Sequence, residues 1–349
     1  MVDLNLIEAV LRRTISRQYP KGSIMDIDRF DWVPGVGLYG VERAWEYLKD
    51  ENAGNFLKDW IERHKDEAYE LRTVNSTAPV MTIMDFNVGG EMDLVKNIAD
   101  YIVDSAPRLK NGALEHTVTE EGVSFSGQMW ADTLFMVCIM LAKLGKAAGD
   151  EKYSREAAKQ LLLHHRYLKD NESGAFFHGY SEALDTHLSA AKWARANSWI
   201  TVSTVEILEL LPKQFEGRDE ILRSLNEQVA AYERYQRSDG MFYTVLDRTD
   251  GYTETSATAA IAYGILRGIE NGYIDRRYQE MWKKAADGVI SHIDGDGIVQ
   301  GVSGGTPIME TVDAYHGIEI LPTLYGQGLT LLMLLEIYKS EGGIDSGEA

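Results

Sequence analysis

Hydrophobic residues recur at helical spacing along most of the chain. In residues 4–19, Leu4, Ile7, Leu11 and Ile15 fall on one side of a helix, and charged residues occupy the other side. The same two-sided pattern returns in residues 55–69, 94–105, 153–168, 221–235 and 278–293. A helix of this kind packs against the protein on one side and meets water on the other. The pattern therefore predicts six helices on the outside of the fold.

A second kind of segment alternates with the first. It is poorer in charge and richer in Gly, Ala, Met and Leu, and it covers residues 36–49, 78–88, 129–146, 195–211, 255–271 and 325–339. A helix that is apolar over most of its circumference is buried on most sides. The alternation predicts an all-α fold, an (α/α)₆ barrel of six inner and six outer helices. No Pro- or Ser-rich linker interrupts it, so we expect residues 1–349 to form a single domain.

The connections between these helices are unequal in length. Those that lead from an inner to an outer helix are short, as at residues 50–54 and 148–152. Several that lead from an outer to an inner helix are long, and they cover residues 20–35, 107–128, 169–194, 236–254 and 294–324. In alternating hairpins, all the long loops lie at the end of the barrel where the inner helices begin. Because long loops are usually functional and helix starts favour anions, we expect ligand binding at this end.

Charge and composition narrow the range of partners. The net charge of −19 argues against nucleic acid and against an anionic membrane surface, because both attract basic proteins. No segment is apolar over a length that spans a bilayer, and residues 1–5 lack the basic start of a signal peptide. Cys138 is the only cysteine, which excludes an internal disulfide and a cysteine-based metal cluster. We therefore expect a cytoplasmic protein, a monomer or homodimer, that needs no metal or other cofactor.

One carboxylate stands at the predicted start of the third inner helix. Asp132 lies within residues 128–136 (QMWADTLFM), so Trp130 and other large apolar residues surround it. Burial among such residues raises the pKa of a carboxyl group toward a value useful for acid–base catalysis, whereas a helix start lowers it. The alternative is an aspartate that only satisfies free backbone N–H groups of the first turn. Both interpretations stay open, and Asp132 is the strongest catalytic candidate.

Aromatic and polar side chains gather around the same predicted end. Trp193 and Trp199 flank Arg195, and His178 lies in the long loop just upstream. Aromatic rings beside hydrogen-bonding groups are the usual means of holding a sugar, and a planar guanidinium fits a carboxylate. The alternatives are aromatic rings that only pack in the core, an arginine paired with a protein acid, and a histidine bonded to backbone. The concentration of these residues favours a sugar site.

Two further motifs carry weaker signals. Residues 301–307 are Gly-rich but lack the lysine of a phosphate-binding loop, and we expect this loop, with Thr306, to line the pocket. His164 and His165 fall on an outer helix without the His-x-x-x-His spacing of a metal site, and we expect them at the surface.

The order of several motifs adds a family resemblance. Residues 129–136 match a W-x-D-x-L-(Y/F)-M pattern, and residues 193–199 match W-A-R-x-x-x-W. With residues 254–259, 301–307 and 325–328, these motifs extend over nearly the whole chain. The combination resembles glycoside hydrolase family 105, the unsaturated rhamnogalacturonyl hydrolases, which are related to the unsaturated glucuronyl hydrolases of family 88.

This resemblance implies an enzyme that removes a 4,5-unsaturated uronic acid from the non-reducing end of a short pectin-derived oligosaccharide. The family acts by hydrating the C4=C5 double bond, without a covalent glycosyl intermediate. By this resemblance Asp132 protonates C4 and then activates the water that attacks C5. The substrate-binding residues carried over are His178, Trp193, Arg195, Trp199, Asn75, Trp130 and Thr306.

The chain departs from the family at the second inner helix, where a second aspartate is common. Residues 72–79 read RTVNSTAP, so either Asn75 or the more distant Asp85 takes its place. One rival function, an unsaturated glucuronyl hydrolase of glycosaminoglycan fragments, shares the chemistry. A sugar epimerase would need two facing histidines, for which His178 and His316 are the candidates. A non-catalytic helical sugar-binding protein would not depend on Asp132.

Overall fold

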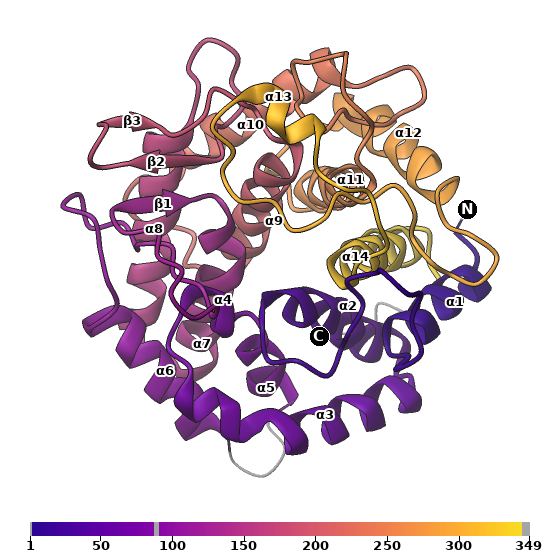
Figure 1. Cartoon of the computed structure of the whole chain (residues 1–349), viewed down its shortest axis with the longest axis horizontal. Helices are drawn as coiled ribbons and strands as arrows, with labels where there is room; N and C mark the ends of the chain where they lie inside the picture. The colour runs from indigo at the N-terminus through magenta and orange to yellow at the C-terminus, as the bar shows by residue number, and fades with distance from the viewer. Residues whose placement is uncertain (1, 87–90, 344–349) are drawn as a thin grey trace.

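Six inner helices form a closed ring in the computed structural model, which describes residues 2–86 and 91–343. They are α2 (Trp32–Leu48), α5 (Val80–Phe86), α7 (Ile139–Ala148), α9 (Ala194–Leu210), α11 (Thr255–Glu270) and α14 (Leu324–Ser340). Each contacts the next in this order, and α14 returns to α2 (Figure 1). The contact between α14 and α2 is close because two glycines face it, and a Cβ on Gly40 would lie 2.7 Å from the Gly328 carbonyl oxygen.

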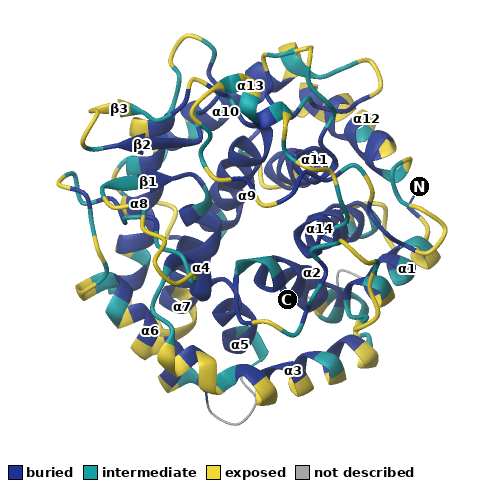
Figure 2. Ribbon diagram, in the orientation of Figure 1, coloured by how far each residue is buried: buried dark blue, intermediate teal, exposed yellow. Residues whose placement is uncertain are grey.

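Amphipathic helices surround the ring. They are α1 (Leu4–Thr14), α3 (Glu51–Glu70), α6 (Met92–Asp104), α8 (Glu151–Leu168), α10 (Arg218–Tyr235) and α12 (Gln279–Ile290), the last preceded by the 3₁₀ turn η2 (Arg276–Tyr278). Figure 2 shows the inner helices buried and the outer ones divided into a buried and an exposed face. The predicted (α/α)₆ barrel is confirmed. Residue 1, residues 87–90, which include the predicted end of the second inner helix, and residues 344–349 lie outside the described residues.

The second inner helix begins differently from the prediction. A single helix over residues 78–88 was expected, but a short α4 (Val74–Thr77) precedes α5, and Pro79 lies between them. Proline has no amide hydrogen, so it interrupts the ladder of helical hydrogen bonds. Thr73 starts α4 with a capping box, in which its side chain and that of Ser76 satisfy each other's backbone N–H groups. The break places Asn75 on its own short helix at the mouth of the barrel.

The third inner helix also begins later than predicted. Residues 128–130 do not start the helix but form the strand β1 (Gln128–Trp130). It pairs antiparallel with β2 (Gly179–Ser181), which pairs with β3 (Thr186–His187). The helical turns start at Asp132, pass through the π-helix η1 (Leu134–Cys138) and continue as α7. The Ala131 amide donates to the His178 carbonyl oxygen over 3.0 Å, so the small sheet brings His178 beside Asp132.

The two adjacent histidines of the outer helix α8 also differ from the prediction. His164 and His165 were expected at the surface, yet both are buried. His164 Nδ1 lies 2.8 Å from the Gln160 carbonyl oxygen, and His165 lies between the hydroxyl groups of Thr204 and Ser224 at 2.9 Å from each. His165 therefore links α8 to α9 and α10, whereas the bond of His164 lies within α8. Within residues 2–86 and 91–343, no helix has the length and apolar character needed to cross a membrane.

Candidate active site

A pocket of about 310 Å³ opens at the end of the barrel where the inner helices begin. This is the end at which the unequal loops predict ligand binding. The pocket is lined by Trp32, Asn75, His116, Val118, Glu120, Val123, Phe125, Trp130, Asp132, Met136, Trp193, Arg195, Gly305, Thr306 and Pro307. Most of the residues proposed from the sequence therefore meet in one cavity.

Asp132 presents its carboxylate to this pocket. Its side chain is 14% exposed, and its Oδ2 lies 3.3 Å from His178 Nε2. The two atoms do not form a well-aligned hydrogen bond, and neither has another hydrogen-bond partner among the described residues. Burial alone would raise the pKa of the Asp132 carboxyl, but His178, His116 and Arg195 outweigh it and hold the pKa below its ordinary value. Asp132 is therefore a carboxylate in the free protein at neutral pH.

His178 is oriented by a residue from a distant loop. Its Nδ1 lies 2.9 Å from the hydroxyl of Tyr315, on the short helix α13 (Val312–His316). The Met309 amide donates to the same hydroxyl oxygen over 3.3 Å, which leaves the phenol hydrogen for His178 Nδ1. Burial lowers the pKa of His178, so the ring is neutral and its own hydrogen lies on Nε2. The N–H of His178 therefore faces Asp132.

The guanidinium group of Arg195 forms most of its hydrogen bonds with other groups of the protein. Its Nη1 donates to the Ser303 carbonyl and hydroxyl oxygens over 3.0 and 2.6 Å, and its Nη2 donates to the Gly304 carbonyl oxygen over 2.8 Å. Nη1 also lies 3.4 Å from Glu254 Oε1. The side chain is 1% exposed, and its Nε has no hydrogen-bond partner in the described part of the chain. Arg195 therefore shapes the loop that carries Thr306 and places a buried cation beside the pocket.

Aromatic rings form one wall of the pocket. The His116 ring stacks on Trp130 with 4.3 Å between centroids, and Phe125 lies 4.4 Å from Trp130. His116 Nδ1 lies 3.1 Å from the Thr133 hydroxyl, and burial lowers the pKa of His116 to about 4, so this ring is neutral. Sequence reasoning missed His116. Its place in the long loop before Asp132 was the available signal.

The structure separates the two candidates for the family's second aspartate. Asn75 lines the pocket, whereas Asp85 forms an ion pair with Lys143 on α7. Lys143 follows Asp132 by eleven positions, which corresponds to about 16 Å along a helix. Glu42 lies 3.6 Å from the same Lys143 ammonium group. Asp85 thus belongs to a buried ionic cluster deeper in the barrel, and Asn75 occupies the position facing Asp132's pocket.

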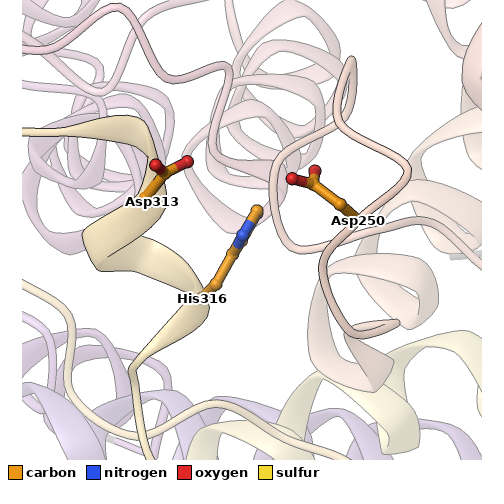
Figure 3. Close-up of side chains that lie close together, drawn as sticks. All are labelled: Asp250, Asp313 and His316. Atoms are coloured by element: carbon orange, nitrogen blue, oxygen red, sulfur yellow. The ribbon is translucent and has the colours of Figure 1, made fainter.

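Besides Asp85, three residues named from the sequence are not among those that line the pocket. His178 contacts Asp132 but does not line the pocket itself. Trp199 is fully buried and packs against Phe135 with 4.8 Å between ring centroids, one helical turn below Arg195. His316 lies on α13 between the carboxylates of Asp250 and Asp313 (Figure 3). Since neither His178 nor His316 lines the pocket, the pair of facing histidines that an epimerase needs is not found there.

The cluster shown in Figure 3 has the residue types of a metal site, with possible ligand atoms within 4.8 Å of one another. Both carboxylates are exposed, however, and both already bind Arg248, at 2.7 Å for Asp250 and 3.0 Å for Asp313. We interpret it as an ionic clasp that joins α13, and hence Tyr315, to the preceding long loop.

Comparisons with known proteins agree with this geometry. The unsaturated rhamnogalacturonyl hydrolase YesR of Bacillus subtilis (strain 168) is 28% identical over 342 residues, which cover 97% of this chain and 95% of YesR. A possible member of the GH105 family from Salmonella enterica serovar Paratyphi A is 31% identical, with a TM-score of 0.89 over 97% of this chain and 93% of that one. A similar protein from Klebsiella pneumoniae is 29% identical, with a TM-score of 0.88 over 98% and 95% of the two chains.

These similarities confirm the resemblance that the motifs indicated. The family model for Glycosyl Hydrolase Family 88 matches residues 6–341, which is nearly the full length. The chain belongs to glycosyl hydrolase family 88 and is a glycoside hydrolase.

Proposed function

We propose that this enzyme removes a 4,5-unsaturated uronic acid from the non-reducing end of rhamnogalacturonan-derived oligosaccharides, with Asp132 as its catalytic residue. The observation that carries the proposal is the Asp132 carboxylate, which lines the pocket beside aromatic side chains and whose Oδ2 has no hydrogen-bond partner among the described residues. The similarity to YesR over nearly the full length supports this substrate class above the alternatives.

The reaction adds water across the C4=C5 double bond. Asp132 donates a proton to C4, and its carboxylate then takes a proton from the water whose oxygen bonds to C5. The hemiketal formed at C5 opens to a ketone, which leaves C1 as a hemiacetal of the next sugar. That hemiacetal collapses to an aldehyde and releases the leaving sugar with a free hydroxyl group. Asp132 ends protonated, ready for another cycle.

The low pKa of Asp132 in the free protein means that the substrate must help to protonate it. Binding of an anionic sugar expels water from the pocket and brings a second negative charge near the carboxylate. Both effects raise the pKa of a carboxyl group. The N–H of His178 then aligns with the Asp132 carboxylate after proton transfer and stabilises it, since hydrogen bonds in free enzymes commonly tighten in the complex.

The positions of the other residues in and around the pocket suggest how each contributes to substrate binding. Trp130 and Trp193 provide faces for the sugar ring, and Asn75 offers an amide for its hydroxyl groups. Arg195 supplies positive charge for the sugar carboxylate through its unpartnered Nε edge and holds Thr306 in place. Trp199 supports the pocket from below through Phe135.

An absorbance assay tests this function. The wild-type protein is incubated with a lyase-generated unsaturated rhamnogalacturonan disaccharide, and the ultraviolet absorbance of its conjugated double bond is followed. We expect the absorbance to disappear with the wild type and to persist with Asp132→Asn. Wild-type protein that leaves unsaturated rhamnogalacturonan, galacturonan and glucuronan fragments all intact would refute the proposal.

Three expectations accompany this proposal. We infer that the chain acts as one catalytic domain, which its continuous core from Val2 to Ile337 supports. A cytoplasmic location suits an enzyme that acts on short oligosaccharides. The monomer or homodimer stays a prediction that light scattering can test.

A further inference from the structure

The side chains that line the mouth of the pocket differ in polarity and charge from those around Asp132. The exposed lining residues are Glu120, Val123, Gly305 and Pro307, and Val118, Phe125 and Trp32 are partly exposed beside them. In a substrate whose unsaturated ring lies at Asp132, the leaving sugar must extend toward this mouth. The side chains there therefore meet the leaving sugar.

The loop that carries these residues is held in place. Residues between α6 and β1 are tied to the strand, because the His116 amide donates to the Gln128 carbonyl oxygen over 2.8 Å and the Gly127 amide donates to Glu115 over 2.7 Å. Phe125 packs on Trp130 at the same place. Val123 is 47% exposed and lines the pocket. This part of the mouth offers a fixed apolar surface to a ligand.

The ionisable side chain exposed at the mouth of the pocket, Glu120, is negatively charged. Arg195 is the one basic residue among those that line the pocket, and it is buried and bound to the loop at Ser303 and Gly304. Glu120 is exposed, and it interacts electrostatically with Asp31, a buried carboxyl group that caps the start of α2. Burial chiefly raises the pKa of Asp31, and Glu120 adds to the effect, whereas Arg29 opposes it. A second anion beside Glu120 would meet repulsion from this exposed carboxylate.

We propose that Glu120 makes the leaving-sugar side of the pocket exclude sugars that carry a carboxylate or sulfate, while Val118, Val123 and Phe125 favour an uncharged 6-deoxyhexose through its methyl group. This inference rests on the proposed function, because it assigns the substrate of the same site. It identifies the feature that separates rhamnose-containing fragments from acidic galacturonan or sulfated glycosaminoglycan fragments.

The test compares two disaccharides that share the unsaturated uronic acid. One has rhamnose as leaving sugar and the other has galacturonic acid, and kcat/KM is measured for each at low and high salt. In Glu120→Gln, the ratio of kcat/KM for the neutral over the acidic disaccharide is expected to fall about tenfold at low salt. The fall should shrink at high salt, because salt screens interactions between exposed charges.

Glu121→Gln is the matched control, since Glu121 is the adjacent exposed acid and does not line the pocket. Its ratio should equal that of the wild type. In Val123→Ser, the ratio should fall through a loss on the rhamnose substrate, independently of salt. Equal ratios in Glu120→Gln and Glu121→Gln, or a wild type that consumes both disaccharides equally well, would overturn the inference while leaving the proposed function standing. A wild type that consumes neither disaccharide would overturn both.

Discussion

Carboxylates lie at two depths of the same barrel, and their surroundings differ. Near the open end of the barrel, Asp132 faces a neutral histidine and the pocket, and its Oδ2 has no hydrogen-bond partner among the described residues. Deeper down, Asp85 and Glu42 share the ammonium group of Lys143. Farther along the same interior, Glu206 pairs with Arg43 at 3.4 Å, and Glu336 pairs with Arg267 at 2.9 Å.

The comparison shows that partners, and not burial alone, separate structural from reactive carboxylates. Burial by itself would raise the pKa of Glu206, but Arg43 and Arg267 overcome it and lower the pKa to about 2. Such a group is held as a permanent anion and cannot exchange protons near neutral pH. Within residues 2–86 and 91–343, Asp132 forms no ion pair with a lysine or arginine, so a bound ligand can still change its protonation.

The largest expected difference between the two depths is in turnover. Asp132→Asn should lower kcat by roughly 10²- to 10⁴-fold, the usual contribution of general acid–base catalysis. Asp85→Asn should leave kcat per folded molecule near the wild-type value, because Asp85 does not reach the pocket. The measurement is loss of ultraviolet absorbance under saturating substrate, normalised to folded protein by circular dichroism. A comparable loss of kcat in both variants would contradict the distinction.

The free energy of unfolding should change more when the deep ionic cluster is altered than when Asp132 is altered. Lys143→Met leaves Asp85 and Glu42 close together without their cation, and the loss of one member of a buried ionic cluster costs about 3–5 kcal/mol. Because the folded protein holds the pKa of Asp132 below its ordinary value, the charged carboxylate stabilises the fold at neutral pH, so Asp132→Asn should lower the free energy of unfolding, but by less than Lys143→Met. Urea denaturation of both variants checks this. A Lys143→Met protein as stable as the wild type would show that the cluster does not support the fold.

The smallest expected effect is on pH dependence. Because hydration needs protonated Asp132, kcat/KM should fall as the pH rises through the pKa of this carboxyl group. His178 lowers that pKa, so His178→Gln should move the alkaline limb of the profile to higher pH while also reducing kcat. The profile of kcat/KM against pH measures the shift.

Tyr315→Phe provides the graded control for this pH effect. It removes the hydroxyl that orients His178 and keeps the ring, so it should lower kcat by up to about tenfold, the value of one hydrogen bond. Tyr252→Phe removes a hydrogen bond to the Tyr315 backbone carbonyl and one from the Thr244 hydroxyl, neither of which involves His178, and should have less effect. An alkaline limb that moves downward in His178→Gln would reverse the assigned influence of His178 on Asp132.

Much of the architecture could be predicted because it depends on local pattern. The alternation of amphipathic and apolar helices follows from side-chain spacing within each segment, and the barrel appears in that order. The predicted starts of two inner helices were wrong, because pairing with a distant strand or an interrupting proline determined the local structure there. Residues 128–130 pair with residues 179–181, and Pro79 divides the second inner helix.

The sequence by itself determined the helical barrel, the end at which its pocket opens and the candidacy of Asp132. Only the tertiary structure decided the neighbours that give Asp132 its chemistry. His116, His178 and Tyr315 come from three different loops, and neither helix periodicity nor spacing can place such loops side by side. The tertiary structure also decided that Arg195 binds a loop of the protein and that Asp85 pairs with Lys143. The physical reason is that hydrogen bonds and ion pairs between distant segments depend on how the whole barrel packs.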